Sequence, residues 1–231
     1  SEFTESALLK AAQLQFDAGA HEKSLAHFNK LATFTENKQI RQEALYGQMK
    51  NNFILGNLNE AIEPAGELLK SDKISDEMKL EAMLIRARAL LQTGEMLLAK
   101  SQFKDIVAFS QGAAGAEAKY RISEIEFKLK DIEAAEKDVF ELINQYAPYD
   151  FWVAKGFILL ADIYKQKDNL FQAKQTLQSI IDNYEGEDLK QEAMKKLTEI
   201  LIEENASAPK DSVQEGETIN IENTGNEGGE E

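Results

Sequence analysis

Few residues in this chain of 231 have a type and spacing that could support catalysis or metal binding. There is no cysteine, so thiolate nucleophiles, disulfides and cysteine-ligated metals are excluded. The only histidines, His21 and His27, are six residues apart, which does not place both on one face of a helix. Neither lies in a serine and aspartate pattern typical of a catalytic triad. We therefore expect no catalytic residue, no metal and no cofactor, and a protein that is not an enzyme.

Carboxylates are abundant, but their pattern is typical of hydrated helix faces. Pairs such as Glu133 with Glu136, or Glu203 with Glu204, lie on faces predicted to be outward, where charged side chains commonly pair along a helix. The sequence has no HExxH, no P-loop and no GxGxxG motif. An enzyme that combines carboxylates from several repeats stays an alternative without a positive signal.

The charge balance excludes two classes of partner. The chain has 26 Lys and Arg against 41 Asp and Glu, a formal net charge of −15. Nucleic acids and anionic lipids both require a positive surface, so we expect neither to bind. No apolar run approaches the length of a membrane span, so direct insertion of this segment is not expected.

An internal repeat organises most of the chain. A small residue expected to start the buried face of a helix recurs at spacings of 36–38 residues. An apolar residue follows it by four positions, a turn residue precedes it by five, and another packing position precedes it by twelve. In chain order, each set has the packing position, the turn residue, the small residue and the apolar residue. The five sets are Ala12/Gly19/Ser24/Phe28, Met49/Gly56/Ala61/Ala65, Ala87/Gly94/Ala99/Phe103, Ser123/Lys130/Ala135/Val139 and Ala161/Asp168/Ala173/Leu177. Each unit is predicted to be a helix (helix A), a short turn and a second helix (helix B).

This pattern resembles the tetratricopeptide repeat (TPR), which has a small residue in helix A, a glycine turn and an alanine in helix B. The match is best in the first three units, because the last two have Lys130 and Asp168 where the family has glycine. The spacing exceeds the family's usual length of about 34 and resembles TPR proteins of bacterial cell envelopes. The resemblance implies an all-α fold: a right-handed α-solenoid of about five units with a C-terminal capping helix.

Two domains follow from composition. Residues 1–204 are expected to form the solenoid, with the capping helix at about 187–204. Residues 205–231 contain seven acids, one base and few large aliphatic residues, so they are predicted to be a disordered acidic tail. The chain starts at Ser1 without Met and so resembles a cut or mature fragment, and whether it is part of a longer chain stays open. The envelope resemblance favours a periplasmic or envelope location over the cytoplasm, and the oligomeric state stays open.

Three segments depart from the repeat. Pro64 lies inside a predicted helix, where proline removes a hydrogen bond, so we expect a kink or a break. The segment 111–115 is rich in glycine and alanine and is predicted to be the most flexible interior connection. The aromatic residues at 146–152 predict a packed junction between units, with a ligand platform as the alternative.

The resemblance also implies where a partner would bind. In TPR proteins the concave surface is lined mostly by the first helix of each unit. Carried across unit by unit, its positions are Gln13, Tyr46, Lys50, Leu84, Arg88, Tyr120, Glu124, Ile158 and Asp162. This surface is expected to be cationic in the middle and acidic toward the C-terminal end, although the Tyr and Leu residues could instead pack between repeats. The family's clamp for a C-terminal carboxylate is absent, because Leu9 and Gln13 occupy its positions.

The leading interpretation is a protein-interaction scaffold that binds a peptide or a partner protein on the concave helix-A surface. The alternative is a structural or self-assembling module of a larger bacterial envelope protein, with no dedicated peptide groove.

Overall fold

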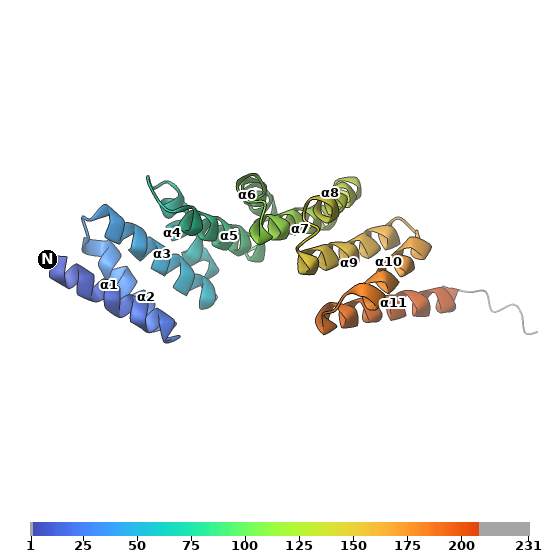
Figure 1. Ribbon diagram of the computed structural model, residues 1–231, viewed down its shortest axis with the longest axis horizontal. Helices are drawn as coiled ribbons and strands as arrows, with labels where there is room; N and C mark the ends of the chain where they lie inside the picture. Colours follow the sequence, from blue (N-terminus) through green and yellow to red (C-terminus); the bar gives the residue numbers. More distant parts are fainter. Residues whose placement is uncertain (1, 208–231) are drawn as a thin grey trace, which may run out of the picture.

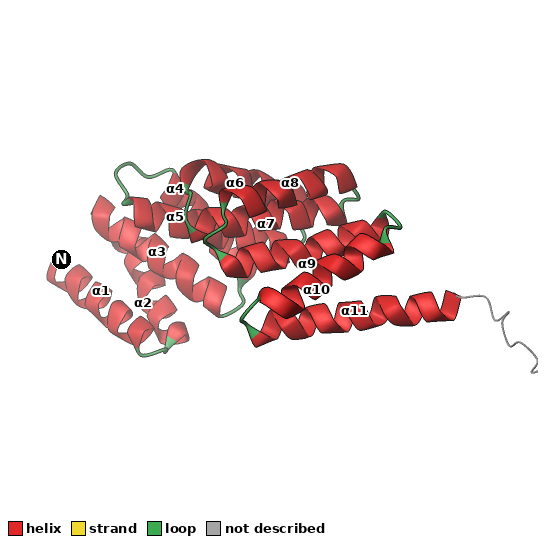
Figure 2. Cartoon of the chain, turned by 45° about the vertical axis from the view of Figure 1, so that its right-hand side comes forward, coloured by secondary structure: helices red, strands yellow, loops and turns green. Residues whose placement is uncertain are grey.

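The computed structural model describes residues 2–207, and within that range all regular secondary structure is helical (Figure 1; Figure 2). The helices are α1 (Glu2–Asp17), α2 (His21–Phe34), α3 (Lys38–Ile54), α4 (Leu58–Leu69), α5 (Asp76–Gln92), α6 (Met96–Phe109), α7 (Ala113–Lys128), α8 (Ile132–Gln145), α9 (Asp150–Gln166), α10 (Leu170–Asn183) and α11 (Glu187–Ser207). Helices α1 to α10 form five consecutive pairs, so the all-α helical repeat predicted from the sequence is confirmed.

The predicted register holds in every unit. The helix-B anchors Ser24, Ala61, Ala99, Ala135 and Ala173 have no exposed surface. The apolar positions four residues later and the helix-A packing positions are buried as well. The small helix-B anchors let the axes of the two helices in a unit approach closely, and larger residues such as Phe103 fill the space between units. Buried residues accordingly form a series of clusters, each made by one unit and the first helix of the next.

The turn inside each unit uses the same backbone device. In unit three, Gly94 has φ of +88° and its N–H donates to Leu91 O, while Glu95 N–H donates to Leu90 O. These two bonds satisfy carbonyls at the end of α5 that would otherwise lack partners, as in a Schellman motif. Lys130 and Asp168 take φ of +66° and +60° at the matching turns of units four and five. The turn therefore forms there without glycine, against the steric preference of L-residues.

The units stack into an elongated arch, in which α6 and α8 lie on its outer edge in Figure 1. Helix A of each unit contacts helix B of the unit before it. The A helices also contact one another directly at α1–α3, α3–α5 and α7–α9. The A helices thus present their remaining faces side by side, and this row of α1, α3, α5, α7 and α9 is called the helix-A surface below.

A break or a kink is predicted at Pro64. The helix does not break there, because α4 continues from Leu58 to Leu69. Proline has no N–H to donate to the carbonyl four residues earlier, which is that of Glu60. Asn52, on α3, supplies the missing donor: its Nδ2 lies 3.2 Å from Glu60 O. A neighbouring side chain thus offsets the hydrogen bond that the proline removes.

The connection predicted at 111–115 is shorter than expected. Helix α7 begins at Ala113, and Gly115 is a buried residue of its first turn. A Cβ at Gly115 would lie 2.0 Å from Ser110 O and 2.8 Å from the Tyr146 hydroxyl oxygen. This glycine therefore permits close packing between chain segments rather than flexibility.

Helix α11 follows the last complete unit and runs three residues beyond the end predicted for the capping helix. Leu189, Ala193 and Ile200 are buried against α9 and α10, whereas Leu201 is 43% exposed. The predicted acidic tail overlaps α11 at 205–207, and its remainder lies outside the described residues. Within residues 2–207, each helix is too short or too polar to span a bilayer.

Candidate functional site

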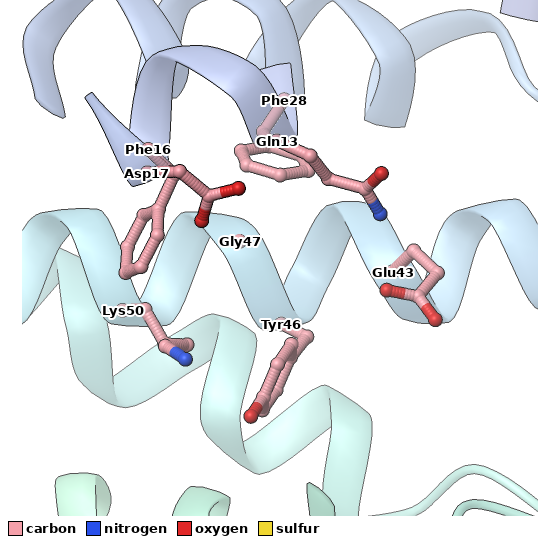
Figure 3. Close-up of a pocket in the computed structure, with 8 residues that line it drawn as sticks. All are labelled: Gln13, Phe16, Asp17, Phe28, Glu43, Tyr46, Gly47 and Lys50. Carbon is pink, nitrogen blue, oxygen red and sulfur yellow. The ribbon is translucent and has the colours of Figure 1, made fainter. Parts of the chain in front are cut away.

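The helix-A surface has an open pocket of about 310 Å³ at its N-terminal end (Figure 3). Helix α1 contributes three of its lining residues, α2 contributes one and α3 contributes four. They are Gln13, Phe16, Asp17, Phe28, Glu43, Tyr46, Gly47 and Lys50, and we call this the α1–α3 pocket. Three residues predicted from the sequence, Gln13, Tyr46 and Lys50, therefore lie around one depression.

Phe28 and Gly47 form the floor of the α1–α3 pocket. The Phe28 ring is almost fully buried and lies against the backbone of α3. A Cβ on Gly47 would lie 2.3 Å from a ring carbon of Phe28, so any larger residue would displace the ring. The absence of a side chain at position 47 therefore allows an apolar floor beneath the polar rim.

Lys50 stands at one side of this pocket between two aromatic rings. Its Nζ lies 4.9 Å from the centroid of Phe16 and 4.8 Å from that of Tyr46, within the range of cation–π attraction. The same Nζ is 3.2 Å from a carboxylate oxygen of Glu81 on α5. The positive charge of Lys50 is thus already paired with the carboxylate of Glu81 in the next unit.

Tyr46 is tied to the same carboxylate. Its hydroxyl donates a hydrogen bond to Glu81 Oε2, so the ring is held between α3 and α5. Burial, the Glu81 hydrogen bond and the nearby charges of Glu81, Glu77 and Glu43 raise the pKa of the Tyr46 phenol. Burial is the largest of these causes, and the neighbouring carboxylates add to it because they disfavour a further negative charge on the phenol oxygen.

A second, smaller pocket continues the surface from α3 to α5, and we call it the α3–α5 pocket. It measures about 140 Å³ and is lined by Lys50, Phe53, Ile54, Glu81, Leu84, Ile85 and Arg88. Lys50 belongs to both pockets, so the two are adjacent. The two depressions together include five of the nine residues predicted from the sequence, all from units one to three.

Arg88 closes the C-terminal side of the α3–α5 pocket through an ion pair with the next unit. Its Nε lies 2.7 Å from Glu117 Oε1, and its Nη2 donates to the other oxygen of that carboxylate. Glu117 is 5% exposed on α7. The middle of the helix-A surface is therefore not a free cationic patch, since both Lys50 and Arg88 have carboxylate partners.

The four candidates nearer the C-terminus are less available to a partner. Tyr120 and Ile158 are buried, the former against Trp152 at a centroid distance of 5.6 Å. Glu124 accepts hydrogen bonds from Arg121 and Lys128 on its own helix. Tyr120 thus packs between repeats, as in the alternative given for the tyrosines, and Ile158 is buried in the same way.

Asp162 is also engaged within the chain. Its two oxygens accept hydrogen bonds from Lys196 of α11 at 2.8 and 2.9 Å. Lys155 likewise pairs with Glu192 at 3.3 Å. These ion pairs join α9 to α11 and occupy the polar groups of the C-terminal end of the helix-A surface.

The aromatic residues at 146–152 form a packed junction between units four and five. Tyr146 is fully buried and Tyr149 and Trp152 are partly buried against the same core, whereas Phe151 stays 43% exposed and packs edge-on against Trp152 at a centroid distance of 5.0 Å. His21 is also engaged, because its Nδ1 lies 3.1 Å from the buried Asn51 side chain. In residues 2–207 no cluster of three or more His, Asp or Glu side chains could hold a metal ion.

Sequence reasoning missed several members of the site. Phe16, Asp17, Phe28 and Glu43 line the α1–α3 pocket, and Glu81 binds both Tyr46 and Lys50. Asp17 and Glu43 each lie three or four residues from a predicted groove position, a spacing that places them on the same helix face. That periodicity was the signal available in the sequence.

Comparisons with known proteins agree with this fold. The tetratricopeptide repeat family model matches residues 157–186, which span most of unit five. The solved structure of YrrB, described as a TPR protein with an unusual peptide-binding site, is 18% identical and covers 81% of this chain and 90% of its own, with a TM-score of 0.62. MamA from Desulfovibrio magneticus RS-1 is 17% identical, covers 77% of this chain and 93% of its own, and has a TM-score of 0.61.

A third structure, TTC0263, a thermophilic TPR protein of Thermus thermophilus, is 17% identical, covers 86% of this chain and 99% of its own, and has a TM-score of 0.51. No curated protein sequence matches the chain significantly. The chain is thus a helical solenoid with the TPR fold, and the part of unit five at 157–186 has the TPR sequence signature.

Proposed function

We propose that this chain is a protein-interaction scaffold that holds an extended segment of a partner protein along α1, α3 and α5. The observation that carries the proposal is the pair of adjacent pockets that share Lys50 on the helix-A surface. TPR-fold proteins generally mediate protein–protein interactions. The similarity to YrrB, which is described as having a peptide-binding site, supports a peptide ligand in particular.

The chemistry of these pockets suits a peptide. The Gln13 amide can both donate and accept hydrogen bonds, as a peptide backbone requires. The Phe16 and Tyr46 rings and the partly buried Leu84 offer apolar contact beside it. The two adjacent pockets give a row of such contacts along α1, α3 and α5, which an extended chain can follow.

In this proposal the C-terminal half of the helix-A surface stabilises the solenoid and does not contact the partner. Its polar groups are engaged in ion pairs such as Asp162 with Lys196, and its aromatic residues pack between units. Breaking these contacts to admit a partner would cost free energy before any was gained. No enzymatic activity is proposed.

The test blocks the α1–α3 pocket without removing a contact of the fold. Gln13 is exposed at its rim, so Gln13→Trp should fill the depression while α1 stays helical. Lys10→Trp places the same bulk at another exposed position of α1 outside the pocket and serves as the matched control. Peptides are first selected from a random display library on the wild-type chain, and their affinities are then measured by fluorescence anisotropy.

We expect Gln13→Trp to weaken the selected peptides at least tenfold and Lys10→Trp to change their affinity less than twofold. Equal binding to wild type and Gln13→Trp would place the binding surface elsewhere and overturn the proposal. Circular dichroism of both variants verifies that helicity is unchanged.

A further inference from the structure

We infer that the α1–α3 pocket receives a basic side chain of the bound segment, with arginine preferred over lysine. The inference rests on the proposed function and adds the chemistry of the ligand. It differs from the expectation of a cationic groove, because the charges around this pocket select a cation rather than an anion.

The charge around the α1–α3 pocket favours a cationic ligand. Asp17 and Glu43 line it, Glu81 lies beside Tyr46 and Lys50, and Glu77 lies near enough to act on the Tyr46 phenol. Lys50 is the single cation among the lining residues that the structure describes, and Glu81 already pairs with it. The remaining carboxylates leave an excess of negative charge, which attracts a cationic ligand and repels an acidic one.

Two carboxylates at the rim of the pocket lack partners within the described residues. The side chains of Asp17 and Glu43 form no ion pair or hydrogen bond with another side chain of residues 2–207. Figure 3 shows the Asp17 carboxylate on the α1 side of the opening and the Glu43 carboxylate on the α3 side, with Gly47 between them. By contrast, the carboxylates of Glu117, Glu124 and Asp162 farther along the helix-A surface are paired. The negative charges of Asp17 and Glu43, at the N-terminal end of the helix-A surface, therefore have no positive partner within residues 2–207.

The shape and polarity of the pocket also suit a long basic side chain. A volume of about 310 Å³ accommodates one long side chain. Its floor is the apolar Phe28 ring and the bare backbone of Gly47, and the Phe16 ring forms a wall. An arginine can lay its methylene stem on such a floor and place its charged group between carboxylates at the rim.

Lys50 shows that a cation can lie beside the aromatic rings of this pocket. Its ammonium group already lies near the rings of both Phe16 and Tyr46. The aromatic surfaces of the pocket are thus compatible with a positive charge, which their negative ring faces attract. A planar guanidinium group also stacks on rings and can bridge two carboxylates, whereas an ammonium group does so less well. Arginine is the better fit for these reasons.

The experiment uses the full chain and the peptides selected on it. The Asp17→Asn and Glu43→Gln double variant removes two charges from the rim with little change in shape. A second double variant, Glu63→Gln with Glu185→Gln, removes two exposed charges away from the pocket and is the matched control. Each selected peptide is also made with its basic residues replaced singly by glutamine or by lysine.

We expect the selected peptides to share one basic position, and arginine there to bind better than lysine. The rim variant should lower affinity about tenfold, because it replaces charge-assisted hydrogen bonds to the two carboxylates by weaker neutral ones. The control should change it less than twofold. Replacing the shared arginine by glutamine should cost little further affinity in the rim variant, because both changes remove the same interaction.

Two outcomes separate this inference from the proposed function. If Gln13→Trp blocks the peptides but they lack a shared basic residue, or the rim variant binds them like wild type, the inference is overturned and the scaffold function stands. If Gln13→Trp does not affect the selected peptides, the proposed function fails and the inference fails with it.

Discussion

Arg88 of α5 and Glu117 of α7 form a bidentate ion pair between consecutive repeats. Arg88 Nε lies 2.7 Å from one carboxylate oxygen, and Nη2 donates to the other. The backbones of α5 and α7 meet less closely than those of the neighbouring pairs α3–α5 and α7–α9. The ion pair thus connects two A helices where direct backbone packing is weakest, and this connection limits the α3–α5 pocket.

Arg88→Met should therefore reduce stability rather than act through partner binding alone. It leaves the Glu117 carboxylate buried without its counter-charge. Breaking a buried pair costs about 3–5 kcal/mol, and partial hydration of Arg88 reduces the expected loss to about 2 kcal/mol. Urea unfolding followed by circular dichroism measures it.

The matched control is Arg41→Met. Arg41 pairs with Glu67 at 3.7 Å on the surface, where both side chains are well exposed. Exposed pairs contribute about 0–1 kcal/mol, so this change should have little effect. Similar losses for the two variants would contradict a structural role for the Arg88 pair.

Gly115→Ala should destabilise the junction of units three and four. The new methyl group would meet the Ser110 carbonyl oxygen, which is backbone and cannot move without shifting the start of α7. Overpacking of this kind costs about 1–3 kcal/mol. Gly66→Ala is the control, because its nearest neighbour, Arg86 Nε, would lie at 3.5 Å and alanine favours a helix by about 1 kcal/mol. Thermal unfolding should show opposite shifts, and equal shifts would disprove close packing at Gly115.

Lys130→Gly should stabilise the turn of unit four. Lys130 has φ of +66°, a conformation that costs an L-residue about 1–2 kcal/mol. Glycine relieves that strain but gains entropy in the unfolded chain, so the expected net gain is about 0.5–1 kcal/mol. Asp168→Gly should gain less, since aspartate tolerates this conformation better. Differential scanning calorimetry gives both values, and a lower melting temperature for Lys130→Gly would refute the strain.

Glu124 should make stability depend on pH. Burial raises the pKa of its carboxyl, but hydrogen bonds and charges from Arg121 and Lys128 outweigh burial and lower it. A carboxyl whose pKa is lower in the folded state stabilises the fold above its ordinary pKa of about 4.3 and loses that effect as the pH falls through the folded pKa. Glu124→Gln should thus cost about 0.5 kcal/mol at pH 7 and progressively less below pH 4. A difference that stays constant from pH 7 to pH 3 would show that ion pairing is not its cause.

The repeat register could be predicted from the sequence because it depends on local rules. Ala99 and Phe103 had to be buried for α5 and α6 to pack, and Gly94 had to take positive φ for the chain to turn. The same turns at Lys130 and Asp168 could be located only by repeat spacing, since their residue types disfavour that backbone. Packing around the turn decided the conformation there.

The candidate site was harder to predict because its chemistry depends on long-range pairing. Lys50 and Arg88 were correctly placed on helix A, but their carboxylate partners are 31 and 29 residues away in the next unit. The stacking angle of the units decides which acid reaches which base. Gly115 shows the same limit, since its close neighbours come from the preceding connection and from Tyr146.

The most direct test of peptide binding on the helix-A surface is hydrogen–deuterium exchange with and without a selected peptide. Binding on this surface predicts slower exchange in the C-terminal half of α1, in α3 and in residues 81–88 of α5, with the largest effect around Gln13–Asp17 and Glu43–Lys50. Protection confined to the B helices, or to α9–α11, would contradict it.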